Sequence, residues 1–74
     1  MEYEDIERRR LRRERERLNR QIDKLVAAGA RINDASDPLE RAAHGHDLDR
    51  HLREFRVFRE DLDRFQRRYG PLGQ

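Results

Sequence analysis

The chain has 74 residues, with 18 Lys and Arg against 16 Asp and Glu, no Cys, no Trp and 34% apolar residues. This length excludes a large enzyme core such as a barrel or a doubly wound nucleotide-binding fold. The apolar side chains are too few to stabilise much more than one small domain, so we expect a single domain over residues 1–74 that completes its core against another chain.

Charged residues make up 46% of the chain, a composition also typical of disordered segments. Disorder predicts no hydrophobic period, whereas this sequence has a helical one, which favours an all-α fold. No apolar run reaches the ~18–20 residues of a membrane span, and the acidic N-terminus is unlike a secretory signal. Together with the absence of Cys, these features predict a cytoplasmic, intracellular protein without membrane contacts.

The first predicted helix runs from about residue 2 to residue 32. Its seam positions recur at alternating steps of four and three, which is the spacing of a coiled-coil heptad. From Leu18 to Ile32 this seam is apolar apart from Gly29. Before Leu18 every second seam position is charged, as at Arg8 and Arg15.

Turn residues occupy 33–37, after which Asp37 is a natural N-cap and Pro38 suits the first position of a helix. Gly45 predicts a kink, or a short helix over 38–44 followed by a helix over about 46–69. Gly70 and Pro71 predict the end of that helix, and residues 70–74 are expected to form a short flexible tail.

A second heptad seam follows positions 44, 48, 51, 55, 58, 62, 65 and 69, which hold His, Leu and aromatic residues. Two long helices joined by a short turn predict an antiparallel hairpin in which the numbers of facing residues sum to about 71. A single hairpin leaves one side of the aromatic residues exposed to solvent, so we expect a dimeric four-helix bundle. The predicted interface residues are Leu11, Leu18, Ile22, Leu25, Leu48, Leu52, Phe55, Phe58, Leu62, Phe65 and Tyr69.

The stretch from 8 to 20 is rich in Arg, which has two interpretations. A solvated helix face is one, because several acids lie three or four residues from an Arg, as Glu14 does from Arg17. Phosphate binding to a nucleic acid is the other. Its candidate residues are Arg8, Arg9, Arg10, Arg12, Arg13, Arg17 and Arg20.

His44, Asp47 and His51 share one helix face and are candidate metal ligands, since imidazole and carboxylate bind Zn, Ni or Fe. The favoured interpretation is that both His residues are seam or rim residues, so no metal site is expected. Polar residues at seam positions commonly set the register and the choice of partner.

The sequence has no Gly-rich phosphate loop, no Ser-His-Asp constellation and no Glu-x-x-His motif. We therefore expect no enzyme activity, no catalytic residue, no cofactor and no small-molecule substrate. The leading hypothesis is a non-catalytic protein–protein interaction or assembly protein, which forms a homodimer or docks to a larger protein. The alternative is a nucleic-acid-binding hairpin that uses the Arg-rich helix.

Overall fold

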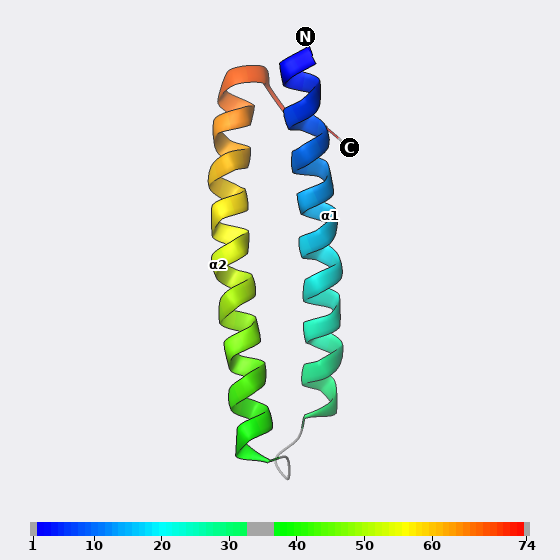
Figure 1. Cartoon of the computed structure of the whole chain (residues 1–74), viewed down its shortest axis with the longest axis vertical. Coiled ribbons are helices and arrows are strands. Elements are labelled where there is room, and N and C mark those ends of the chain that lie inside the picture. The colour runs from blue at the N-terminus through cyan, green and yellow to red at the C-terminus, as the bar shows by residue number, and fades with distance from the viewer. Residues whose placement is uncertain (1, 33–36, 74) are drawn as a thin grey trace.

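The structure is a computed structural model that describes residues 2–32 and 37–73. Within these ranges the chain forms two helices, α1 (Glu2–Arg31) and α2 (Pro38–Tyr69). They pack side by side in opposite directions, and the molecule measures 54 × 17 × 15 Å (Figure 1). The prediction of an all-α helical hairpin is confirmed. Residues 33–36 of the predicted turn lie outside the described residues.

Both ends of α2 have the caps that the sequence predicts. The side chain of Asp37 accepts a hydrogen bond from the Leu39 N–H at 2.9 Å, and Pro38 is the first helical residue. At the other end, Gly70 has a φ of 91°, which favours glycine, and its N–H donates to the Gln66 carbonyl at 2.9 Å. Local chemistry therefore fixes where this helix begins and ends.

The expected division into two helices at Gly45 is wrong, because α2 runs through this residue as one helix. A glycine inside a helix costs only about 1 kcal/mol relative to alanine. The turns on both sides of Gly45 are hydrogen-bonded, and packing on α1 stabilises the whole helix, so the local cost is outweighed.

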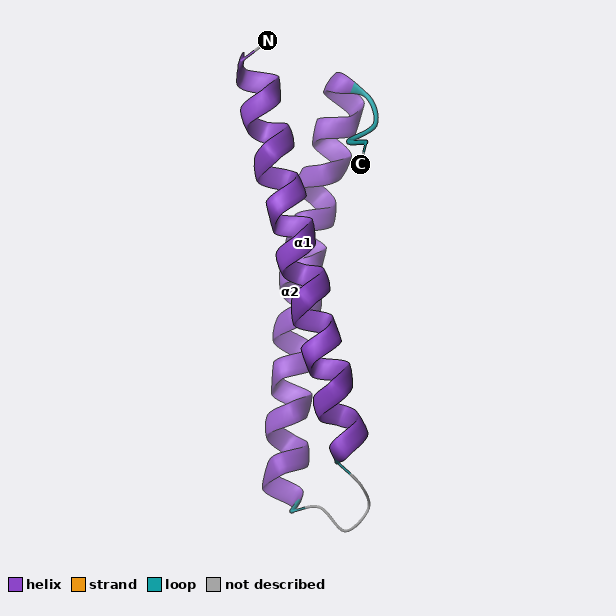
Figure 2. Cartoon of the chain, turned by 90° about the vertical axis from the view of Figure 1, so that its right-hand side faces the viewer, coloured by secondary structure: helices purple, strands orange, loops and turns teal. Residues whose placement is uncertain are grey.

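An ion pair between the two helices shows their register. Arg17 donates to Glu54 at 2.6 Å, and these residue numbers sum to the predicted value of 71. Further along, the guanidinium carbon of Arg8 lies 4.9 Å from the centre of the Phe65 ring, as expected for an Arg among the aromatic residues. Figure 2 shows the helices crossing along their length, with the loop after α2 at the same end as the N-terminus.

The core of the hairpin is small. The apolar side chains that are buried among the described residues come from both helices and from the tail: Leu11, Leu18, Phe58, Phe65 and Leu72. Leu72 is only 2% exposed, and Leu62 and Tyr69 pack against the same cluster. The expectation of a flexible tail is therefore wrong as far as Gly73, because burial of Leu72 holds the tail against the helices.

Candidate functional site

The chain after α2 forms a strap, which we define as residues 70–73. Figure 1 shows the strap crossing from the end of α2 to α1. Arg8 Nη1 donates to the carbonyl oxygens of Pro71 and Leu72, at 3.0 and 2.5 Å. Arg12 Nη2 lies 3.4 Å from the Leu72 oxygen, and Arg15 Nη1 lies 3.3 Å from the Gly73 oxygen. Three guanidinium groups thus donate hydrogen bonds to backbone carbonyl oxygens that have no partner within a helix.

The Arg residues that hold the strap belong to one stripe of α1. Positions 8, 12, 15, 19, 22 and 26 follow steps of four and three, so they lie along one face of the helix. The strap covers the first half of this stripe. Beyond the strap the stripe becomes apolar at Ile22, which is half-buried, and at Val26, which is 63% exposed.

A matching stripe runs along α2. Positions 69, 66, 62, 59, 55, 52 and 48 share one face at the same spacing, and they include two exposed polar residues, Gln66 and Arg59. Tyr69 and Leu62 pack against the cluster that includes Leu72. Nearer the turn, Leu52 is 58% exposed and Phe55 is 43% exposed. Both stripes meet the strap, so they lie on the same side of the hairpin.

We call the open part of this side the flank, which consists of Ile22, Val26, Leu48, Leu52 and Phe55. None of these side chains is charged, although nearly half of the chain is. A contiguous apolar patch on the surface of a protein often marks an interaction site. The flank is therefore the best candidate for an interaction surface.

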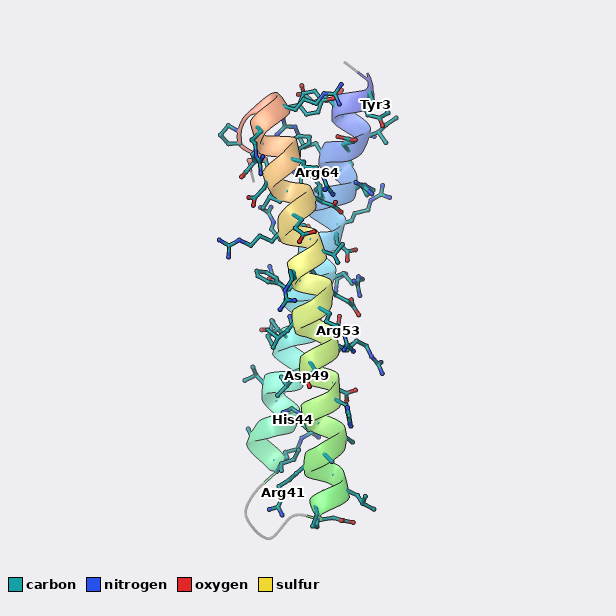
Figure 3. All side chains as sticks on the ribbon, turned by 90° about the vertical axis from the view of Figure 1, so that its left-hand side faces the viewer. Tyr3, Arg41, His44, Asp49, Arg53 and Arg64 are labelled. Carbon is teal, nitrogen blue, oxygen red and sulfur yellow. The ribbon has the colours of Figure 1, made fainter. Side chains whose placement is uncertain are left out.

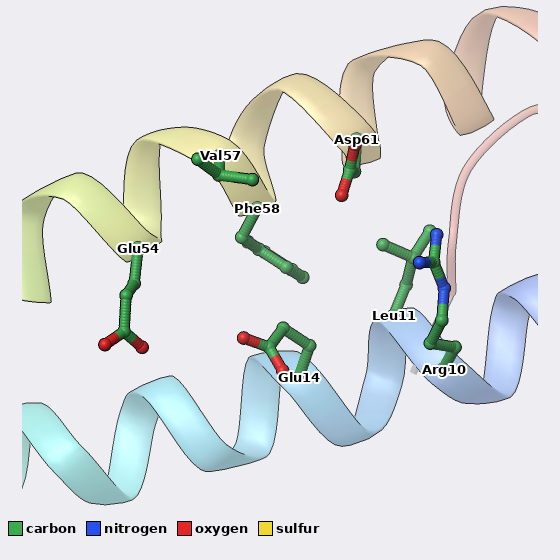
Figure 4. A pocket seen from close by; sticks show the side chains of 7 residues that line it. All are labelled: Arg10, Leu11, Glu14, Glu54, Val57, Phe58 and Asp61. Carbon is green, nitrogen blue, oxygen red and sulfur yellow. The ribbon is translucent and has the colours of Figure 1, made fainter.

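The opposite side of the hairpin has a groove of about 300 Å³. In Figure 4, Phe58 points from α2 towards α1 between Leu11 and Glu14, and Glu54 and Asp61 lie on either side. Val57 and Arg10 complete the lining.

Arginines neutralise the carboxylates around this groove. Arg17 donates to both Glu14 and Glu54, and Arg64 pairs with Asp61. The hydrogen bond from Arg17 holds the pKa of Glu14 below its ordinary value of 4.5, and the two carboxylates raise the pKa of Arg17. A ligand in this groove would therefore meet apolar side chains at the base and carboxylate–arginine pairs around them.

The predicted nucleic-acid residues fall into distinct groups. Arg8 and Arg12 are turned towards the strap, and Arg17 is held by two carboxylates. The others are exposed on α1: Arg9, Arg10, Arg13 and Arg20. The sequence prediction omitted Arg15, which holds the strap, and also Lys24 and Arg31, which are exposed on the same helix.

The predicted interface residues also divide by exposure. Leu11, Leu18, Phe58 and Phe65 are buried within one chain. Five others are half-buried, and two are exposed. The half-buried ones are Ile22, Leu25, Leu48, Leu62 and Tyr69, and the exposed ones are Leu52 and Phe55. The sequence prediction missed Val26 because this residue lies beside the seam. The signal that could have identified it is its position on the same stripe of α1 as Arg8, Arg12 and Arg15, which hold the strap.

The described residues contain no group of three His, Cys, Asp or Glu side chains placed to hold a metal ion. His44 lies against Gly29, where an added Cβ would meet its Nε2 at 3.0 Å. His51 is buried, and its Nδ1 has no hydrogen-bond partner in the described part of the chain. Asp47 is exposed.

Comparisons with known proteins found no family model, no curated protein and no solved structure that matches this chain. In the described ranges, neither helix combines the length and the apolar character needed to cross a membrane.

Proposed function

We propose that this chain is a non-catalytic assembly protein that forms a homodimer through the flank. The observation that supports this proposal most directly is the exposure of Val26, Leu52 and Phe55 beyond the end of the strap. Burial of such side chains stabilises association by roughly 25 cal/mol per Å² of apolar surface removed from water.

The shape of the hairpin also favours association. Its accessible surface is 6174 Å². A folded monomer of 9.1 kDa is expected to expose about 4,900 Å², so this chain exposes about 1,300 Å² more. A standard interface buries about 800 Å² from each partner. The elongated hairpin thus exposes enough surface for an interface of this size.

A second copy fits the flank better than a charged partner would. The flank has no charged member, so an apolar strip of the same composition is its natural complement. In a two-fold dimer the same patch of both copies meets itself, and this is the commonest symmetry among oligomers. The strap covers the neighbouring half of the same side, which limits the interface to the half nearer the turn.

The experiment is size-exclusion chromatography with light scattering at low and high salt. Leu52 and Val57 are both 58% exposed on α2, but Val57 lines the groove on the opposite side. We expect the wild-type chain to elute as a dimer at both salt concentrations, since apolar contacts are not screened. Leu52→Glu should elute as a monomer, and Val57→Glu should stay dimeric.

Three results would contradict the proposal. A monomeric wild-type chain at high concentration would exclude the dimer. Equal behaviour of the two variants would exclude a specific role of the flank. Dissociation by Val57→Glu alone would assign the interface to the groove side instead.

A further inference from the structure

The helical pattern of α1 places three of its acids on one face and several free bases on another. Glu4, Glu7 and Glu14 are half-buried on the side that faces α2, and Glu4 and Glu14 pair with Arg8 and Arg17. The opposite side of the helix is basic. We define the outer face of α1 as Arg9, Arg13, Arg20, Lys24 and Arg31, all of them exposed.

These five bases are free to bind an external ligand. Within residues 2–32 and 37–73, none of them forms an ion pair. By contrast, the strap holds Arg8, Arg12 and Arg15, and two carboxylates hold Arg17. Two exposed acids, Glu16 and Asp23, are interleaved with them, which leaves three more bases than acids. The outer face therefore has a net positive charge that the hairpin itself does not neutralise.

The outer face of α2 is different. Figure 3 looks onto this helix, where Asp49, Arg53 and Arg64 are labelled along its length. Exposed acids and bases alternate there, with Glu60 and Asp63 among the Arg residues. The basic character is thus specific to α1 and does not follow from the net charge of +2 alone.

From this asymmetry we propose that the outer face of α1 binds the phosphate backbone of a nucleic-acid duplex. The 22 residue steps from Arg9 to Arg31 span ~33 Å at 1.5 Å per residue. Over that length a DNA duplex has about 20 phosphate charges. A straight row of flexible Arg and Lys side chains along a rigid helix can follow such a polyanion.

A duplex fits this face better than a single strand or a lipid surface. The stretch from Arg9 to Arg31 has no aromatic residue on which single-stranded bases could stack. The large apolar side chains of this stretch lie on α1 faces turned to α2 or to the flank, so the outer face has none to insert into a bilayer. Phosphate contacts alone predict binding without sequence preference.

This inference does not depend on the proposed dimer. Arg9, Arg13 and Arg20 each follow a residue of the stripe under the strap and along the flank, so they lie about 100° further round the helix. A second copy on the flank would leave the outer face open. A failure of the proposed dimer would not affect the inference either, because a monomeric hairpin would present the same row of bases.

The test measures binding of the full chain to a fluorescent mixed-sequence DNA duplex by anisotropy. One variant replaces Arg9, Arg13, Arg20 and Lys24 with Gln. The matched control replaces Arg53, Arg56, Arg64 and Arg67 of α2 with Gln, which changes the net charge by the same amount. Circular dichroism checks that both variants keep their helical content.

We expect wild-type affinity to fall by about 500-fold between ~50 and ~200 mM salt if all five bases contact phosphates. The α1 variant should lose at least ~10-fold in affinity at low salt, and the slope of log affinity against log salt should become shallower by about 3 to 4. The α2 control should keep the wild-type slope. A double-stranded RNA of the same sequence should also bind, because its phosphates offer the same charges.

Several results would overturn this assignment. One is no binding of the wild-type chain to either duplex at low salt. Another is an equal loss in both variants, which would show an effect of net charge only. Tighter binding to a single strand, or equally tight binding to vesicles with phosphatidylserine, would exclude the duplex as the preferred ligand.

Discussion

Arg17 donates to Glu54 of the other helix at 2.6 Å and also to Glu14 on its own helix. One guanidinium thus joins the two helices near the middle of the hairpin. The hydrogen bond holds the pKa of Glu14 below 4.5, its ordinary value in an unfolded chain. The charged form of this carboxyl is therefore stabilised by folding.

The first prediction is an acid-dependent contribution of Glu14 to stability. A depressed carboxyl pKa contributes fully above about pH 4.5, and the contribution disappears as the pH falls through the lower, folded value. The difference in urea midpoint between wild type and Glu14→Gln should be small at pH 7 and should shrink as the pH falls below 4.5. Glu16→Gln is the control, since the exposed Glu16 forms no ion pair among the described residues. A pH-independent difference for Glu14→Gln would contradict the prediction.

The second prediction concerns the strap. Leu72→Ala should lower the free energy of unfolding by about 2–5 kcal/mol, because it removes a buried side chain and leaves a cavity. Leu39→Ala should change it by less than ~0.5 kcal/mol, since Leu39 is 77% exposed. Urea unfolding followed by circular dichroism measures both. Similar values for the two variants would mean that the strap does not pack in solution.

The third prediction uses two glycines inside the helices. Gly45→Ala should raise the free energy of unfolding by about 0.5–1 kcal/mol, because an added Cβ meets nothing within 4 Å. Gly29→Ala should gain less, since the ring of His44 must move away from the new methyl group. Thermal unfolding under identical conditions ranks the two variants. A larger gain for Gly29→Ala would show that His44 does not lie against this helix.

The fourth prediction concerns the aromatic core. Phe65→Ala should lower the free energy of unfolding by about 3–5 kcal/mol, since the ring is buried and lies under the Arg8 guanidinium. Phe58→Ala should have an effect of the same size. Tyr3→Ala is the control, because Tyr3 is 65% exposed near the start of α1. If the three variants unfold alike, the packing between the helices differs from that described.

Periodic and local features of the fold are predictable from the sequence. The helical period predicts the hairpin, which the two packed helices confirm, and the Arg17–Glu54 pair agrees with the predicted facing positions. Asp37 and Gly70 predict both ends of α2, because capping depends on residues within one turn. The pattern also identifies residues that become buried, such as Leu11 and Phe58.

The strap and the flank were harder to predict, for a physical reason. Leu72 is a single apolar residue between Pro71 and Gly73, so no period marks it, and its burial depends on residues about 60 positions away. The open flank follows from where the strap stops. Sequence spacing shows that Leu52 and Phe55 lie near a seam, but only packing shows how much of each remains exposed. For the same reason the sequence could not show which Arg residues of α1 bind the strap or a carboxylate and which remain free.

The strap also has a consequence for how the chain folds. Pairing of the helices can begin beside the turn between nearby residues, whereas the bond from Arg8 to Leu72 joins residues 64 positions apart. Closing that contact has the higher entropic cost, so we expect it to form late. Interactions that form after the transition state slow unfolding more than they speed folding. The strap should therefore stabilise the hairpin chiefly by slowing its unfolding, and its loss should shorten the lifetime of the native state.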